Sequence, residues 1–185
     1  MKPRSMTLLS HLLLADLVKK KDVIVDATMG NGHDTLFLAR ICSYVYAFDI
    51  QDEALRRTRT LLDEHGITNV ELIKDSHSRI PDYVQDFQGV IFNLGYLPKG
   101  SRELTTRSKT TIRALDRLLP LSDTGFILIV CYPGHSEGKR ETEAVGRWLS
   151  DLDPRIYQVT TIHHPYQPND PPLIHLVIGK KKDGT

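Results

Sequence analysis

Glycine and acidic residues cluster directly after the first short apolar segment of the chain, residues 23–27. The segment reads on as Asp26-Ala27-Thr28-Met29-Gly30-Asn31-Gly32-His33-Asp34-Thr35. Gly30 and Gly32 let the backbone approach a ligand without a Cβ in the way, and the N-terminus of a following helix can receive a carboxylate or a phosphate. Two glycines also suit a simple turn, so the segment indicates a cofactor loop only if its neighbours agree.

An acid stands where such a loop needs one. Asp49 ends the second apolar segment, residues 44–48, about 20 residues beyond the loop, where a carboxylate can accept both hydroxyls of a ribose. The alternative is that Asp49 caps the following helix. No arginine adjoins Asp49, which disfavours a ribose phosphate and hence a phosphorylated dinucleotide.

The loop departs from a dinucleotide fingerprint at its last glycine, which is replaced by Thr35. Asp34 would place a negative charge near a pyrophosphate. S-adenosylmethionine has no pyrophosphate and carries an ammonium and a sulfonium, for which Asp26 and Asp34 are suitable partners. Asp75 ends the third strand and could stand near the adenine with Ser76 and His77. Each acid could instead be a cap or a solvated loop residue.

The fourth apolar segment runs into Asn93-Leu94-Gly95-Tyr96-Leu97-Pro98. An asparagine at a strand end can present its carbonyl to an amine, and Tyr96 offers a face on which a base can stack. The segment is analogous to the Asn-Pro-Pro-Tyr signature of nitrogen methyltransferases. The alternative is that Tyr96 and Leu97 simply pack beneath a loop.

Two further groups of residues suggest substrate contacts. Lys109, Arg113 and Arg117 are spaced four apart, so on a helix they share one face that either binds RNA phosphates or is merely solvated. Tyr132 and His135, with the histidines near residue 163, are expected at one edge of the sheet and could line the substrate mouth. None of these has the spacing of metal ligands, so we expect no metal centre.

The elements that must position these residues alternate along the chain. Strands are predicted at residues 23–27, 44–48, 70–74, 90–93, 126–131, 157–162 and 173–178, with helices at 34–40, 53–65, 106–119 and 136–149. Asp52 is a plausible N-cap and Gly66 a plausible C-cap of the second of these helices. The last two strands are joined by a short loop containing several prolines, so one of them should be antiparallel. The predicted fold is α/β: a Rossmann-like class I methyltransferase fold, mostly parallel, seven-stranded, with an antiparallel C-terminal hairpin and helices on both faces.

Length, net charge and cysteine content restrict the number of domains, the mode of RNA binding and the expected compartment. The 185 residues predict one domain, 1–185, that includes an N-terminal helix over about residues 5–20. The formal net charge of +1 means that RNA binding needs a local basic patch. Two distant cysteines and an apolar stretch too short to cross a bilayer lead us to expect a cytoplasmic protein without membrane contact. Homodimerisation is left open.

Three motifs, in their order, resemble a known family. The chain is similar to the bacterial family labelled rRNA methylases over nearly its whole length. The resemblance rests on the glycine segment, residues 26–35, on residues 93–98 and on Tyr132-Pro133-Gly134-His135, with Asn169-Asp170-Pro171-Pro172 near the end. The resemblance implies a class I, S-adenosylmethionine-dependent methyltransferase acting on tRNA at the anticodon stem-loop. The implied reaction methylates the 5-aminomethyl group of wobble 2-thiouridine. The family usually continues Gly-Gly-Asp-Lys after Pro98, whereas this chain has Lys99-Gly100-Ser101-Arg102, so substrate detail could differ.

The sequence predicts three sets of site residues. Cofactor contacts are expected from Asp26, Thr28, Gly30, Asn31, Gly32, Asp34, Thr35, Asp49, Gln51, Asp75, Ser76, His77 and Asn93. Substrate contacts are expected from Tyr96, Pro98, Arg102, Lys109, Arg113, Tyr132 and His135, and catalytic roles from Asn93, Tyr96 and Asp26. The sequence does not assign the general base, for which Asp26 and His135 are candidates.

Other functions stay open at this stage. The methyl acceptor could instead be rRNA or a small-molecule amine. An NAD-dependent oxidoreductase would have to bind its cofactor with Thr35 in place of the last glycine. A non-catalytic RNA-binding module would need the basic helix but neither Asp49 nor the cofactor loop.

Overall fold

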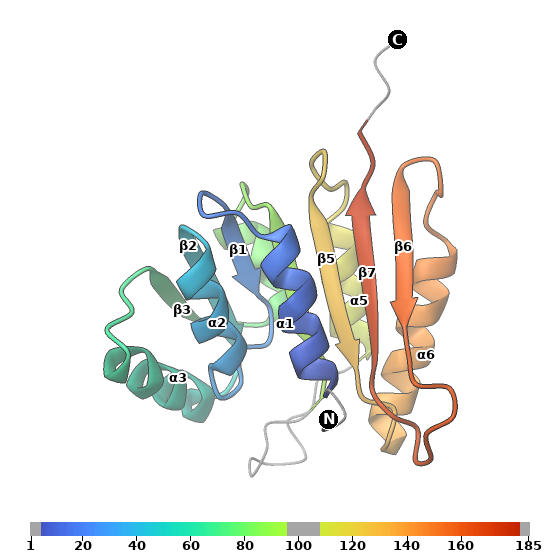
Figure 1. The fold of residues 1–185 in the computed structure, drawn as a ribbon, viewed down its shortest axis with the longest axis horizontal. Helices are drawn as coiled ribbons and strands as arrows, with labels where there is room; N and C mark the ends of the chain where they lie inside the picture. Colours follow the sequence, from blue (N-terminus) through green and yellow to red (C-terminus); the bar gives the residue numbers. More distant parts are fainter. Residues whose placement is uncertain (1–4, 96–107, 182–185) are drawn as a thin grey trace.

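A single seven-stranded sheet organises the part of the chain that the computed structural model describes, residues 5–95 and 108–181 (Figure 1). The strands are β1 (Val23–Asp26), β2 (Tyr44–Asp49), β3 (Val70–Lys74), β4 (Gly89–Asn93), β5 (Phe126–Cys131), β6 (Tyr157–Ile162) and β7 (Leu173–Gly179). Their spatial order is β3-β2-β1-β4-β5-β7-β6. Every predicted strand is confirmed, with bounds that differ by at most one residue.

The strand directions explain where a site can form. Strands β1 to β5 pair in parallel, whereas β7 is antiparallel to both β5 and β6, which confirms the predicted C-terminal hairpin. The chain order reverses between β1 and its neighbour β4. Ligands of doubly wound sheets bind beyond the carboxyl ends of the strands at such a reversal. The ends of β1, β2 and β4 therefore define the region in which a ligand is expected.

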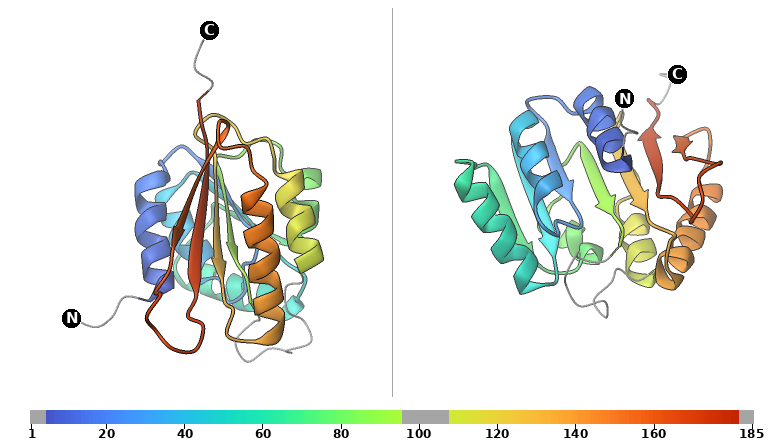
Figure 2. Two further views of the ribbon diagram at one scale, coloured as in Figure 1. Left: turned by 90° about the vertical axis from the view of Figure 1, so that its right-hand side faces the viewer. Right: turned by 60° about the horizontal axis from the view of Figure 1, so that its bottom comes forward.

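Helices cover both faces of the sheet (Figure 2). On one face, α1 (Met6–Leu17), α2 (His33–Ile41) and α3 (Asp52–Glu64) share an apolar core that contains Leu14, Leu38 and Ala54. On the other face, α4 (Ile80–Tyr83), α5 (Ser108–Arg117) and α6 (Ser136–Ser150) share a second core that contains Leu115 and Trp148. Burial of both faces accounts for the nearly unbroken apolar sequence of β5, all six residues of which are buried.

Four details differ from the sequence-based expectation, and the first is that α1 ends at Leu17 and not near residue 20. A 3-10 turn, η1 (His77–Arg79), runs into α4, and these elements are too short for any helical period to be visible in the sequence. Asp52 is the first residue of α3 and not its N-cap, which is Gln51 without a side-chain capping bond. Helix α5 ends at Arg117, before Pro120, while the predicted start of this helix lies outside the described residues. The residue before a proline avoids helical backbone, which explains the earlier end.

Candidate functional site

The glycine loop, residues 27–32 between β1 and α2, has left-handed backbone at Gly30 and Gly32, a conformation that only glycine adopts easily. Gly32 has φ of 81° and stands as the N-cap of α2. A Cβ at this position would lie 2.8 Å from side-chain atoms of Thr58, which is buried on α3. Both the left-handed backbone and the close approach to α3 therefore require glycine here.

Asp26 anchors this loop from within. One carboxylate oxygen accepts the Thr28 backbone N–H at 3.1 Å, and the other accepts the Thr35 hydroxyl at 2.6 Å. The residue is completely buried. Burial and the nearby charge of Asp34 raise the pKa of Asp26 to about 7, against the hydrogen bonds from Thr35 and Thr28. The contacts seen here are those of a loop anchor, and the predicted roles as ammonium partner and base stay predictions.

Asp49 is held beside the same loop. Its carboxylate accepts the Gly30 N–H at 3.1 Å on one oxygen and the Gln51 N–H at 3.0 Å on the other. Burial raises the pKa of Asp49, partly offset by these backbone hydrogen bonds. Each carboxylate oxygen has a further lone pair. The group is thus oriented and can accept two hydroxyls, which fits the ribose of S-adenosylmethionine.

Asn93, at the end of β4, is fixed to the loop through both its backbone and its side chain. Its backbone N–H donates to the Thr28 hydroxyl at 2.7 Å, and its side-chain amide nitrogen donates to Asp34 Oδ2 at 2.8 Å. The other oxygen of Asp34 is 2.6 Å from Nε2 of His11, on α1. Asp34, expected as a partner of the cationic cofactor, therefore already contacts two side chains of the chain itself.

Electrostatics keep Asp34 ionised and Tyr132 protonated. Burial alone would raise the pKa of Asp34, but the hydrogen bonds with His11 and Asn93 outweigh it, and the pKa is lowered. Burial raises the pKa of Tyr132, while hydrogen bonds with Thr7 and Asn93 act in the opposite direction. Tyr132 therefore lies beside Asn93, as expected for a residue at this edge.

His11 is the site residue that the sequence did not reveal. Its ring stacks on Phe37 at 4.0 Å with an interplanar angle of 3°. The only signal in the sequence is a polar residue within the apolar stretch of α1. Its partner is 23 residues away, on another helix, so the contact depends on how α1 packs against α2.

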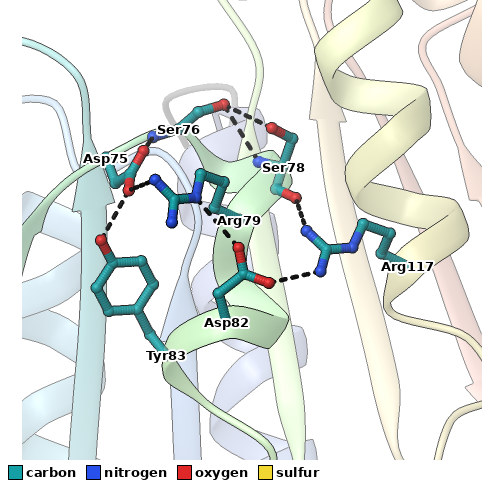
Figure 3. Close-up of polar contacts among 7 residues, drawn as sticks. All are labelled: Asp75, Ser76, Ser78, Arg79, Asp82, Tyr83 and Arg117. Atoms are coloured by element: carbon teal, nitrogen blue, oxygen red, sulfur yellow. Dashed lines mark hydrogen bonds and ion pairs between the residues drawn. The ribbon is translucent and has the colours of Figure 1, made fainter.

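Around the end of β3, the predicted adenine region contains a polar network (Figure 3). Asp75 accepts the Tyr83 hydroxyl at 2.7 Å and pairs with Arg79 at 3.1 Å. Arg79 also pairs with Asp82, which pairs in turn with Arg117 of α5. His77 is buried against Phe92, and burial lowers the pKa of His77 to about 4. Asp75 and Ser76 thus lie on a segment that is tied to α5.

The three spaced basic residues of α5 line one groove with Ala144 of α6, which confirms their common face. Arg117 nevertheless donates to the Ser78 carbonyl at 2.8 Å and to Asp82 at 2.6 Å. These two contacts within the protein account for the position of the Arg117 side chain. Lys109 and Arg113 remain the predicted phosphate-binding residues of this helix.

The other predicted substrate residues divide into two groups. His135 is the N-cap of α6, where its Nδ1 accepts the Gly138 N–H at 3.0 Å. Tyr96, Pro98 and Arg102 lie outside the described residues.

Within residues 5–95 and 108–181, no group of His, Cys, Asp and Glu side chains is suited to hold a metal ion. Across the same residues, no helix is long and apolar enough to cross a membrane.

The strand order, the glycine loop and the acid at the end of β2 define a class I methyltransferase, a class that uses S-adenosylmethionine. Residues 45–178 match the family described as "Putative rRNA methylase", and the chain belongs to that family.

Known proteins agree with this assignment. A "putative rRNA-methylase" from Clostridium thermocellum superposes with a TM-score of 0.92 at 36% identity, covering 97% of this chain and all of that one. A methyltransferase from Streptococcus mutans, solved in complex with SAH, has a TM-score of 0.88 at 38% identity, covering 97% of this chain and 99% of its own. The chloroplastic "tRNA (mnm(5)s(2)U34)-methyltransferase" of Arabidopsis thaliana is 36% identical over 79% of this chain. The match spans 59% of the length of that curated relative.

Proposed function

We propose that this protein is an S-adenosylmethionine-dependent RNA methyltransferase that N-methylates the 5-aminomethyl group of wobble 2-thiouridine in tRNA. The observation that carries the proposal is the placement of Asn93 and Asp49 at the ends of β4 and β2, on either side of β1, in a chain 36% identical to a relative named for this tRNA position. The carbonyl oxygen of Asn93 suits an amine, and the carboxylate of Asp49 suits the hydroxyls of a ribose.

The residues of the loop would hold the methyl donor. Asp49 would accept the ribose hydroxyls, Gly30, Asn31 and Gly32 would hold the methionine portion, and the segment at Asp75 would hold the adenine. S-adenosylmethionine, when bound, would supply a methyl group from its sulfonium to the amine nitrogen, leaving S-adenosylhomocysteine, while the proton lost by the amine passes to solvent water.

The chain itself supplies orientation for the acceptor. Asn93 accepts a hydrogen bond from the amine through its carbonyl oxygen, which aims the nitrogen lone pair. Tyr96 offers a stacking face for the uridine, and Lys109 and Arg113 offer charges to the RNA backbone. An ammonium has no lone pair, so a partly desolvated site that disfavours a second cation favours the reactive neutral amine.

The decisive experiment is nucleoside mass spectrometry of bulk tRNA, taken from a strain that lacks this modification and incubated with the protein and S-adenosylmethionine. We expect 5-aminomethyl-2-thiouridine to gain one methyl group, and we expect Asn93→Ala to abolish the gain while SAH affinity stays within about threefold.

A parallel incubation with rRNA tests the substrate that the family description names. Methylation of rRNA alone, or of neither RNA by a protein that binds SAH, would overturn the tRNA assignment and leave the cofactor assignment standing.

A further inference from the structure

The side-chain amide of Asn93 has two ends of opposite chemistry, and only one suits an amine that donates a hydrogen. The carbonyl oxygen accepts, whereas the nitrogen carries two donors. An asparagine free to flip would present the wrong end part of the time. The arrangement around Asn93 therefore affects how often the carbonyl oxygen is available.

Asp34 supplies a contact that discriminates between the two ends. An ionised carboxylate is only an acceptor, so the Asn93 atom 2.8 Å from Asp34 Oδ2 has to be the nitrogen. Reversing the amide would bring two acceptor oxygens together beside a partly buried charge. The Asp34 side chain is only 14% exposed, so water compensates little for such a loss.

The hydrogen bond with His11 lowers the pKa of Asp34 and so favours the ionised carboxylate, the form that accepts the Asn93 N–H. Nε2 of His11 lies 2.6 Å from Asp34 Oδ1, the oxygen that Asn93 does not use. The imidazole is in turn fixed by its parallel stack on Phe37, so the pair is built from α1 and α2 together. The charged groups that act on Asp34 are His11 and His33, and Asp34 in turn acts on Asp26.

We propose that the His11–Asp34 pair is a positioning device, which pins the Asn93 amide nitrogen and leaves its carbonyl oxygen to receive the N–H of the methyl acceptor. The proposal rests on the amine acceptor of the proposed function. It assigns Asp34 to the acceptor side of the site and gives α1 a direct role in the site through His11.

Steady-state kinetics with matched variants test the device. Asp34→Asn keeps the size of the side chain but accepts either orientation of Asn93, and we expect kcat to fall about 10-fold or more. His11→Ala should also lower kcat, whereas His11→Gln, whose amide nitrogen can still donate to Asp34, should recover most of it. His65→Ala is the control, since it removes an exposed histidine at the C-terminal end of α3 that belongs to neither the His11–Asp34 pair nor the loop after β1. The Kd for SAH should change less than about threefold in all four variants.

A second readout does not depend on turnover. The side-chain NH₂ signals of Asn93, identified by their loss in Asn93→Ala, can be followed by ¹H–¹⁵N NMR. We expect their exchange with water to quicken about fivefold or more in Asp34→Asn and His11→Ala, and to stay unchanged in His11→Gln and His65→Ala.

The two kinds of failure are distinguishable. Unchanged kcat and unchanged amide signals in Asp34→Asn would overturn the positioning role. A loss of SAH affinity greater than 10-fold in that variant would also overturn it, because Asp34 would then serve the methyl donor. A wild-type protein that methylates no amine would overturn the proposed function, while the NMR comparison would still decide whether His11 and Asp34 orient Asn93.

Discussion

Asp49 is the residue whose contribution to cofactor binding is simplest to isolate. Its carboxylate is aimed by two backbone N–H groups and keeps lone pairs for a ribose. Removing a charged acceptor from two hydroxyls should weaken SAH binding roughly 10- to 100-fold in Asp49→Ala. Isothermal titration calorimetry measures this directly, with the exposed Asp63→Ala as control. Equal affinity in both variants would refute the ribose role.

The buried Asp26 should make stability depend on pH. Its pKa is about 7 in the fold against 3.8 for an unperturbed group, so between these values the folded state keeps a proton that the unfolded state has lost. The free energy of unfolding should therefore fall as pH rises from about 4 to 7, by up to about 4 kcal/mol from this group. Above pH 7 the contribution stays lost.

Urea unfolding of the wild type and of Asp26→Asn at pH 5 and pH 7.5 tests this pH dependence. The stability of the variant relative to the wild type should improve as the pH increases, because the amide does not titrate. Parallel changes in the two proteins would show that Asp26 does not hold a proton in the folded state.

At the scale of elements, α5 is attached through Arg117 to η1 and α4, the two elements that follow β3. Its guanidinium bridges the Ser78 carbonyl and Asp82 (Figure 3). Because both side chains of the ion pair are about one third exposed, we expect Arg117→Ala to cost only about 1 kcal/mol, or a Tm decrease of about 2–4 °C.

Arg113→Ala, one turn earlier on α5, is the matched control. It should leave Tm within about 1 °C and instead weaken RNA binding. The comparison needs only thermal denaturation and a filter-binding assay. The reverse pattern would mean that Arg117 contacts RNA and Arg113 supports the fold.

The sequence predicted the elements better than the contacts between them. Strands such as β5 are recognisable because burial on both faces leaves a continuous apolar run, and the positions of Asp49 and Asn93 follow from the strand ends. The His11–Asp34 contact was not predictable, because it depends on how two helices pack. Arg117 was placed on the correct face of α5, but helical spacing does not show that η1 lies beside it.

At the scale of the whole molecule, the net charge of +1 predicts weak long-range attraction to RNA. Salt dependence should then report a few local contacts. If Lys109 and Arg113 each neutralise one phosphate, the double variant Lys109→Gln/Arg113→Gln should reduce the slope of log K against log salt by about 1.4–1.8.

Fluorescence anisotropy with labelled tRNA at several salt concentrations measures that slope. Lys139→Gln/Arg140→Gln, which removes two exposed charges from α6, provides a control of equal charge. An identical decrease in both double variants would indicate a diffuse field and no specific phosphate contacts on α5.

The pairing of β1 with β4 brings together parts of the chain that a ribosome makes at different times. Gly30 and Asp49 meet within the first three strands, whereas Asn93 reaches Thr28 across 65 residues. A nascent chain that has just completed β3 already holds Asp26, Gly30 and Asp49, with one edge of β1 still open. We expect that edge to need protection from aggregation until β4 emerges. During synthesis, the ribose-binding part of the site therefore precedes Asn93, the residue assigned to the amine of the acceptor.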